Sequence, residues 1–296
     1  MTASQLTNVH KSYILGLVSV SLWSTVATAF KLALASLDLF QVLFISCLTS
    51  TLCLGLMLLL QGKLSLTISS INKLVIPSLT RGFLNPFIYY LVLFEAYNRL
   101  PAQIAQPINY SWVIVLSLMS VVFLKQRLSR TDWLAGMVCY AGVIIISSRG
   151  DWITLRFFTD PGVWFAIFST VIWSTYWILT IKDTRDITVA MFLNFLVSLP
   201  LVTLSCFIFS DFYLYEQQGV LASVYIGLFE MSITFVCWSL ALKLAENTSR
   251  VGNLVFLSPF LSLLLIHHIL GEQIYTTTWA GLMIIVSGLL MQKMKG

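Results

Sequence analysis

Charge is the scarcest property of this chain. Charged residues make up only 10% of its 296 residues, whereas soluble domains carry about 25%. Hydrophobic residues reach 58%, and the mean hydropathy is +0.90. A soluble domain of ordinary composition is therefore excluded, and the sequence predicts a protein that lies almost entirely within a lipid bilayer.

Motifs for several kinds of chemistry are also missing. The sequence contains no Gly-x-x-x-x-Gly-Lys-Ser/Thr phosphate loop, no His-Glu-x-x-His and no Gly-x-Ser-x-Gly. The five cysteines fall within apolar segments and form no Cys-x-x-Cys pair. We therefore expect no ATPase or hydrolase activity, no cofactor, no metal site and no disulfide. Energy would come from an ion or substrate gradient, or from a separate partner chain.

Long apolar segments fill the rest of the sequence. A spanning helix needs about 20 mostly apolar residues, and ten segments qualify, which predicts an all-α integral membrane protein. His10 and Lys11 precede the first segment, which is too long for a cleavable signal peptide and is expected to act as an uncleaved anchor. The predicted spans are residues 13–32, 38–60, 75–97, 102–124, 131–148, 161–181, 187–209, 219–241, 251–270 and 275–292.

The ten spans form two copies of five. Trp23-Ser24-Thr25 recurs as Trp173-Ser174-Thr175, 150 residues later, and Trp133 and Gly142 recur as Trp279 and Gly288, both 146 residues later. Because five is odd, the second copy would enter the membrane inverted, as in many secondary transporters with a midplane site. The predicted divisions are a cytoplasmic N-terminus (1–12), a first repeat (13–148), an outer loop (149–160), a second repeat (161–292) and a cytoplasmic C-terminus (293–296).

Positive charges predict the orientation. With the N-terminus inside, 13 of the 17 lysines and arginines lie in inner segments and 4 in outer ones, and short loops are the setting in which positive residues stay in the cytoplasm. Both termini are expected in the cytoplasm of a multi-pass protein of the cell membrane. The net charge of +5 then reflects topology and gives no reason to expect a nucleic-acid partner.

These features together resemble a known family. The Trp-Ser-Thr of spans one and six, and the stretch Leu257-Ser258-Pro259-Phe260-Leu261 that runs to Leu270-Gly271-Glu272, are similar to the drug/metabolite transporter superfamily of EamA type. The first copy departs from the pattern, with Val113 in place of the proline and Leu124-Lys125-Gln126 in place of Leu-Gly-Glu. Asn109-Tyr110-Ser111-Trp112 resembles amino-acid exporters of this superfamily.

The resemblance implies a basket of helices that moves small metabolites, such as amino acids, by alternating access. Spans one, three, four, six, eight and nine would line the cavity. Partners would be a small-molecule substrate, the bilayer and a coupling ion such as the proton, and the protein would work as a monomer or a weak homodimer.

Ionisable residues inside spans are the candidates for ion coupling, because they are expensive in hydrocarbon. Glu230 lies near the middle of span eight, and the repeat offset sets it opposite Leu84, beside Asn85. Arg81 lies one turn from Asn85 and is a possible partner of Glu230, or else extends to the inner interface. Pro86 is expected to loosen span three. Glu95 and Arg99 have the spacing of a helical ion pair.

Polar and aromatic residues of the cavity-lining spans are the candidates for substrate binding. Span four carries Gln103, Gln106, Tyr110 and Ser117 on one helical face, and amides can both donate to and accept from a zwitterion. Bonding between helices is the alternative role for them. The candidate substrate-binding residues are Trp23, Thr25, Asn85, Tyr89, Gln103, Gln106, Asn109, Tyr110, Trp173, Tyr176, Trp238 and Asn253.

Three functions are consistent with the sequence. The first is export of amino acids or similar metabolites. The second is import or exchange of a nucleotide-like or sulfonium metabolite, which would need a more positive cavity than Arg81 alone provides. The third is a membrane enzyme or assembly factor without transport, which predicts polar residues gathered at one interface rather than spread through spans one, three, four and eight.

Overall fold

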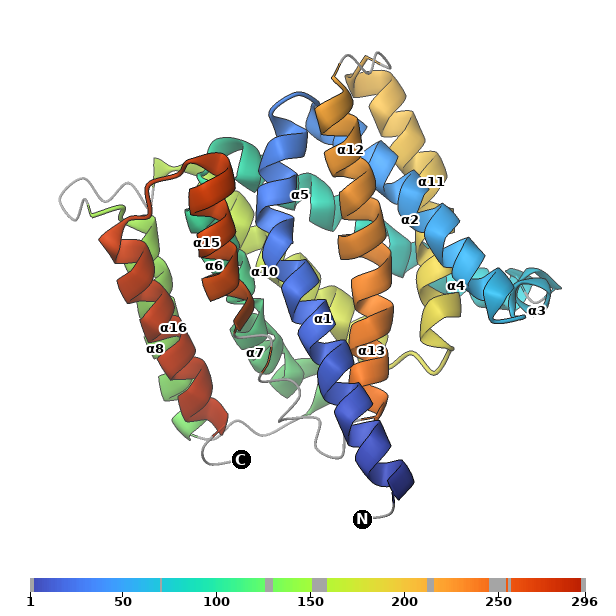
Figure 1. Cartoon of the computed structure of the whole chain (residues 1–296), viewed down its shortest axis with the longest axis horizontal. Coiled ribbons are helices and arrows are strands. Elements are labelled where there is room, and N and C mark those ends of the chain that lie inside the picture. Colours follow the sequence, from blue (N-terminus) through green and yellow to red (C-terminus); the bar gives the residue numbers. More distant parts are fainter. Residues whose placement is uncertain are drawn as a thin grey trace. The chain divides into compact units, whose positions relative to one another are not determined.

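The computed structural model describes residues 3–69, 71–125, 130–150, 159–211, 216–244, 254 and 257–293, and helices account for nearly all of these (Figure 1). The elements in chain order are α1 (Ala3–Leu34), α2 (Leu39–Leu60), α3 (Leu64–Ser69), α4 (Ile71–Gly82), η1 (Phe83–Ile88), α5 (Tyr89–Arg99), α6 (Ala102–Tyr110), α7 (Trp112–Leu124), α8 (Arg130–Ser147), α10 (Pro161–Ile181), α11 (Ile187–Phe209), α12 (Gln217–Tyr225), η2 (Ile226–Ile233), α13 (Thr234–Leu244), α15 (Ser258–Leu270) and α16 (Thr276–Lys293).

Six stretches of the described chain are long and apolar enough to cross a membrane, and three shorter helices are equally apolar in character. The long ones are Asn8–Leu34, Leu39–Leu60, Ala102–Phe123, Pro161–Ile181, Ile187–Phe209 and Gln217–Ala241. The third predicted span is not in this set, and the structure divides it into α4, η1 and α5. Spans four and eight, expected as single helices, are also divided, at Ser111 and at η2.

Aspartates fix where three of the long helices begin. The Asp38 side chain accepts hydrogen bonds from the backbone N–H groups of Phe40 and Gln41, and the Asp38 backbone N–H donates to Oε1 of the Gln41 side chain. Asp160 caps α10, where Pro161 follows at the first helical position, and Asp186 caps α11. An aspartate ahead of an apolar run is a strong helix-start signal, which explains why these starts agree with the sequence-based ones.

The chain divides into two compact units, and each takes helices from both sequence repeats. Unit 1 comprises residues 1–87 and 185–265, and unit 2 comprises residues 88–184 and 266–296. In unit 1, α1 packs along α12 and α13, α2 along α11, and α4 on α11. In unit 2, α10 packs on α5, α6 and α7, and α8 pairs with α16.

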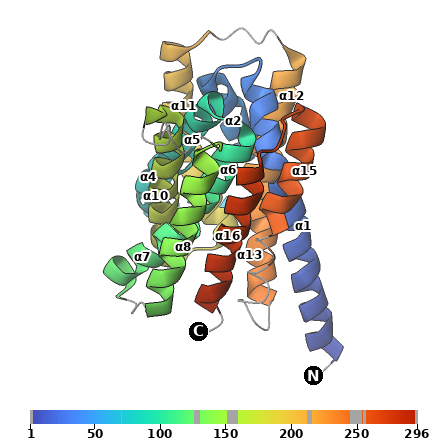
Figure 2. The same ribbon diagram turned by 90° about the vertical axis from the view of Figure 1, so that its left-hand side faces the viewer.

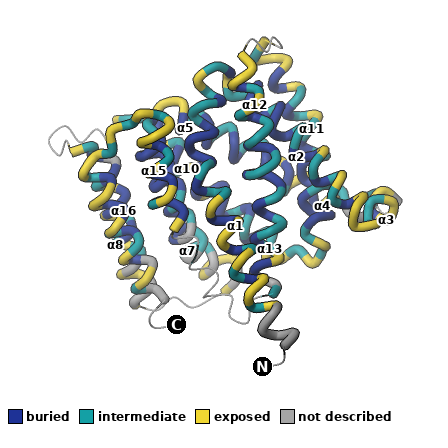
Figure 3. The backbone as a smooth tube through the Cα atoms, in the orientation of Figure 1, coloured by how far each residue is buried: buried dark blue, intermediate teal, exposed yellow. Residues whose placement is uncertain are grey.

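Helices α2 and α11 form an antiparallel pair at the centre of unit 1. At one end, Asp186 before α11 binds Lys63 after α2, with Oδ2 and Nζ 2.8 Å apart. At the other end, Asp38 before α2 accepts a hydrogen bond from the hydroxyl of Ser210, which follows α11. These two helices are predicted spans two and seven, the equivalent spans of the two repeats. Figure 3 shows buried positions running through α2, whereas the short α3, which lies between predicted spans, is mostly exposed.

Helices α8 and α16 form a second antiparallel pair, this one in unit 2, and they lie side by side in Figures 1 and 2. The thiol of Cys139 lies 3.2 Å from the carbonyl oxygen of Ile285, its counterpart at the offset of 146. Gly142 and Gly281 bring the two backbones together, since a Cβ on either glycine would lie 2.6 Å from the carbonyl oxygen of the other.

The α8–α16 contact gives a test of packing. Gly142→Ala should destabilise the protein by about 1–3 kcal/mol, because the added methyl meets the backbone of Gly281. Gly136→Ala, on the same helix, is the control. Its methyl would meet only the Ile114 side chain at 3.4 Å, and alanine favours the helix by up to about 1 kcal/mol. Thermal unfolding in detergent measures both, and a Gly142→Ala variant as stable as Gly136→Ala would contradict the packing.

Candidate functional site

Spans three and eight are distorted at equivalent positions. A π-helical segment, η1, follows α4, and a second, η2, lies between α12 and α13. The offset of 146 sets residues 83–88 opposite 229–234, so both repeats carry the distortion. Asn85 leaves helical geometry altogether, with φ −142° and ψ 115°, and the Asn85–Pro86 peptide is cis. The prediction that Pro86 loosens this span is confirmed. Local π-helix in a longer helix is frequent at functional sites.

Hydroxyl groups lie against carbonyl oxygens in and next to the distorted segments. Ser50 of α2 donates to the carbonyl oxygen of Met231 at 3.1 Å, and Ser232 lies 2.7 Å from that of Gly227. In the other repeat, Ser198 of α11 donates to the carbonyl oxygen of Gly82. Ser50 and Ser198 are 148 residues apart, at equivalent places in spans two and seven.

Glycine allows each distorted span to approach the neighbouring helix closely. A Cβ on Gly82 would collide with the backbone oxygen of Asn194 on α11, and one on Gly227 would collide with that of Ser46 on α2. Ser46 and Asn194 are again 148 residues apart. The two repeats therefore build the same contact twice, span three on span seven and span eight on span two.

Polar groups of different chemistry occupy the two distorted segments. Glu230 of η2 is 8% exposed, and Asn85 of η1 is 1% exposed. Within the described residues, the buried Oδ1 of Asn85 has no hydrogen-bond partner, which is uncommon for a buried amide. Arg81, at the end of α4, donates from Nη1 to the carbonyl oxygen of Pro77 at 2.8 Å. A pair between Arg81 and Glu230 stays a prediction.

Five of the six aromatic candidates, all except Tyr110, lie in two clusters, one in each unit. In unit 1, the Trp23 ring centroid lies 5.2 Å from that of Trp238 and 6.0 Å from that of Phe235. In unit 2, the Trp173 ring stacks on Tyr89 at 4.4 Å and on Tyr176 at 5.5 Å. Trp23 and Trp173 are repeat equivalents, and so are Phe235 and Tyr89. In unit 1 the tryptophan of span one contacts a ring of span eight, and in unit 2 the tryptophan of span six contacts a ring of span three.

The polar candidates of span four differ in what they contact. Asn109 lies 2.9 Å from the Ser169 hydroxyl, and its amide nitrogen lies 3.4 Å from the hydroxyl of Tyr89. Gln106 is 2% exposed, and its Oε1 has no hydrogen-bond partner in the described part of the chain. Tyr110 is half-buried at the end of α6.

Two further candidates lie outside span four. On α1, the hydroxyl of Thr25 lies 2.7 Å from the hydroxyl of Tyr225. Asn253 lies outside the described residues.

Gln103 instead joins the beginnings of α6 and α16. Its amide nitrogen donates to the carbonyl oxygen of Gln273 at 2.8 Å, and its Oε1 accepts from Tyr275 N–H at 2.9 Å and from the Thr278 hydroxyl at 3.1 Å. Glu272 adds to this junction, because its carboxylate accepts the backbone N–H of Ala102 at 2.9 Å. A carboxylate on the first amides of a helix is stabilising.

Glu95 and Arg99 form the expected helical ion pair, with Oε1 and Nε 2.6 Å apart, so that prediction is confirmed.

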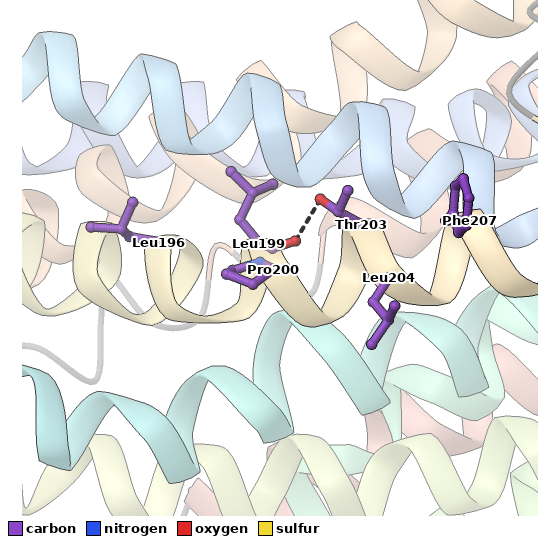
Figure 4. Close-up of a pocket in the computed structure, with 6 residues that line it drawn as sticks. All are labelled: Leu196, Leu199, Pro200, Thr203, Leu204 and Phe207. Carbon is purple, nitrogen blue, oxygen red and sulfur yellow. Dashed lines mark hydrogen bonds between the residues drawn. The ribbon is translucent and has the colours of Figure 1, made fainter.

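Two of the cavities lined by described residues lie within unit 1. The larger, of about 620 Å³, runs along α11 alone (Figure 4). Five of its six lining side chains are apolar, which suits the acyl chains around a spanning helix rather than a polar solute. The lining residues are Leu196, Leu199, Pro200, Thr203, Leu204 and Phe207. The smaller cavity, of about 330 Å³, includes Lys63 and Asp186 at the ends of α2 and α11.

The sequence profile of the EamA-like transporter family matches residues 10–148 and again 160–292. The chain belongs to this family. It is therefore a multi-pass membrane transporter rather than an enzyme, with a substrate and lipid as its partners, and the two matches indicate an internal repeat. Membership of a transporter family excludes the hypothesis that the protein is a membrane enzyme without transport activity.

Two further similarities agree with the family. The transporter is 37% identical over 68 residues to the permease-like protein YdzE of Bacillus subtilis (strain 168), a match that covers 23% of this chain and 86% of that protein. A solved structure titled only "Crystal structure of protein" superposes with a TM-score of 0.69 at 22% identity, over 96% of this chain and 97% of that one. The second similarity concerns the fold alone.

Sequence reasoning missed the residues that support the distorted spans of the transporter. Gly82 and Gly227 are 145 residues apart, and the serine pairs are 148 apart. Aligning spans two and seven, in addition to the tryptophans, would have identified them. The motif Leu270-Gly271-Glu272 likewise gives no indication in the sequence that Glu272 caps α6. Gly271 has φ +68°, and its first-copy equivalent Lys125 has φ +57°, so both repeats turn through a left-handed residue here.

The support of η2 by α2 is testable. Ser50→Ala should destabilise the transporter by about 1–3 kcal/mol, because the buried carbonyl oxygen of Met231 loses its donor. Ser287→Ala removes an exposed hydroxyl that bonds its own helix, and should change stability by no more than about 0.5 kcal/mol. Equal melting temperatures for the two variants would contradict the supporting role of Ser50.

Proposed function

We propose that this transporter is a secondary active exporter of small metabolites, most directly amino acids, that works by alternating access in the cytoplasmic membrane. The observation that carries the proposal is the pair of equivalent helix distortions, η1 with Asn85 and η2 with Glu230, at buried positions. Discontinuous helices at corresponding places in two repeats are where secondary transporters bind substrate and coupling ion.

Ten spans in an inverted five-plus-five arrangement are part of this proposal. Support comes from the two helix pairs made of equivalent spans, α2 with α11 and α8 with α16, because both pairs are antiparallel. Equivalent spans of an inverted repeat run in opposite directions, as these do. The excess of positive charge in the inner segments supports cytoplasmic termini.

Glu230 is the proposed coupling residue. A carboxylate at this depth is costly when ionised, so it would be protonated when closed from water and would release the proton when opened to it. Arg81 is the proposed counter-charge, because both residues belong to unit 1 and Arg81 lies at the end of α4, immediately before η1.

An amino acid fits the proposed lining because amides and aromatic rings can hold a zwitterion. Asn85 and Gln106 are the strongest candidates, since each has a buried amide oxygen whose hydrogen bond is not made within the described residues. Gln103 is proposed instead to hold α6 to α16, because its amide is already used by those contacts. The remaining proposed lining residues are Trp23, Thr25, Tyr89, Asn109, Tyr110, Trp173, Tyr176, Trp238 and Asn253.

Glu230→Gln tests the coupling. In proteoliposomes the variant should lose uphill transport driven by a proton gradient but keep counterflow, because glutamine retains the shape of the side chain without a titratable proton. Glu95→Gln is the control, since Glu95 is a helix-end partner of Arg99, and it should keep both activities. Full gradient-driven flux in Glu230→Gln would remove Glu230 from the mechanism.

Gln106 and Gln103 provide a second comparison, within one helix. Gln106→Leu should raise the KM of transport several-fold and leave the melting temperature nearly unchanged. Gln103→Leu should lower the stability by about 1–3 kcal/mol, because the buried donors and acceptors around it lose their partner. An unchanged KM in Gln106→Leu would assign that side chain to packing.

A further inference from the structure

The smaller cavity of unit 1 brings together both signs of charge. It has a volume of about 330 Å³, at the lower end of the range for small-molecule sites. The end of α2, the beginning of α11 and the middle of α13 form it. The lining residues are Gln61, Lys63, Asp186, Ile187, Thr188, Val236, Ser239 and Leu240.

Helix-ending motifs place the two charges. Gly62, with φ +66°, turns the chain after α2, and Lys63 N–H bonds back to the carbonyl oxygen of Leu58 at 2.9 Å. This is the Schellman arrangement that glycine favours, and it directs Lys63 to the cavity. Asp186 begins α11 and accepts the N–H groups of Thr188 and Val189 at 3.0 and 3.3 Å.

The Asp186 carboxyl is ionised at neutral pH. Burial by itself raises its pKa, but the hydrogen bonds from Lys63 and from the backbone N–H groups of Val189 and Thr188 outweigh burial, so the pKa lies below its usual value. The cavity thus holds a negative charge 2.8 Å from a positive one.

Among the described residues, the opposite end of the α2–α11 pair has no such charged pair. Its equivalent aspartate, Asp38, also caps a helix, but its side-chain partner there is the neutral hydroxyl of Ser210. If helix packing alone required the ion pair, the equivalent aspartates Asp38 and Asp186 would both have a lysine partner. Within the described part of the chain, the charged pair and its cavity occur at one end of these two helices, which indicates that this end does something more than hold the helices together.

We infer that this cavity is a loading site that binds a small apolar α-amino acid as a zwitterion, with its ammonium on Asp186 and its carboxylate on Lys63. Ile187, Val236 and Leu240 would contact the side chain of the ligand, and Gln61, Thr188 and Ser239 supply further polar contacts. The inference rests on the proposed function, in which this end of unit 1 faces the cytoplasm and export begins there.

Opening the ion pair for a ligand is inexpensive. The Lys63 and Asp186 side chains are 41% and 37% exposed, and ion pairs of this kind contribute only about 0–1 kcal/mol. A zwitterion replaces one ion pair with two charge-assisted bonds, whereas a ligand with a single charge leaves one protein charge without a new partner. The cavity therefore discriminates in favour of a ligand that carries both charges.

Calorimetric titration of the purified transporter with L-leucine tests the site. 4-Methylpentanoate and isoamylamine, which each lack one of the two charges, serve as matched probes. L-leucine should bind at least roughly tenfold more tightly than either probe, and Asp186→Asn and Lys63→Gln should each weaken its binding roughly tenfold. Asparagine caps a helix as well as aspartate does, so Asp186→Asn should keep the melting temperature.

Asp38→Asn is the control, because it makes the same substitution at the equivalent cap without a neighbouring lysine, and it should bind L-leucine as the parent does. Repeating the titrations in the Gln106→Leu background separates the cavity from the central lining. No binding of L-leucine, equal binding of all three probes, or unchanged binding in both Asp186→Asn and Lys63→Gln would overturn the inference.

Counterflow of L-leucine in proteoliposomes distinguishes this inference from the proposed function. Counterflow with an unchanged KM in Asp186→Asn would leave export standing and overturn the loading site. Charge-dependent binding without any counterflow would support the cavity as a binding site and count against amino-acid export.

Discussion

Every backbone N–H and C=O group of a spanning segment must find a partner inside the protein, because hydrocarbon offers none. Regular helices meet this requirement by themselves. Spans three and eight depart from regular helix, since both pass through π-helical segments and one contains the non-helical Asn85. Ser50 of α2 and Ser198 of α11 donate to carbonyl oxygens of these spans, so the distorted spans are held against the α2–α11 pair beside them.

That contact explains why glycine and serine recur at equivalent positions. A donor as short as serine reaches a neighbouring backbone only if the two helices are close, and Gly82 and Gly227 permit the approach. The two repeats therefore share the framework of the distortion and differ in the groups that it carries. One has an amide and a proline, and the other has the carboxylic acid of Glu230. Two similar frameworks with different chemistry suit a transporter that must bind a solute and a coupling ion separately.

Several conspicuous residues have structural partners that limit their role in binding. The Trp173 ring is stacked on its neighbours, Gln103 has three hydrogen bonds to the beginning of α16, and Glu272 caps α6. Polar residues within spans thus occur both at helix junctions and at candidate binding sites. What separates Asn85 and Gln106 from Gln103 is that their buried amide oxygens have no hydrogen-bond partner among the described residues.

The sequence by itself determined the membrane class, the family and most helix limits, because apolar length, aspartate caps and the tryptophan repeats are local or periodic signals. The sequence also showed that Glu230 is an ionisable residue within a span, and it predicted the break near Pro86. Only the tertiary structure decided that Gln103 joins α6 to α16, that Glu272 caps a helix 170 residues away along the chain, and that Lys63 meets Asp186 across 123 residues. Such contacts depend on which helix ends are adjacent, and hydropathy carries no information about adjacency.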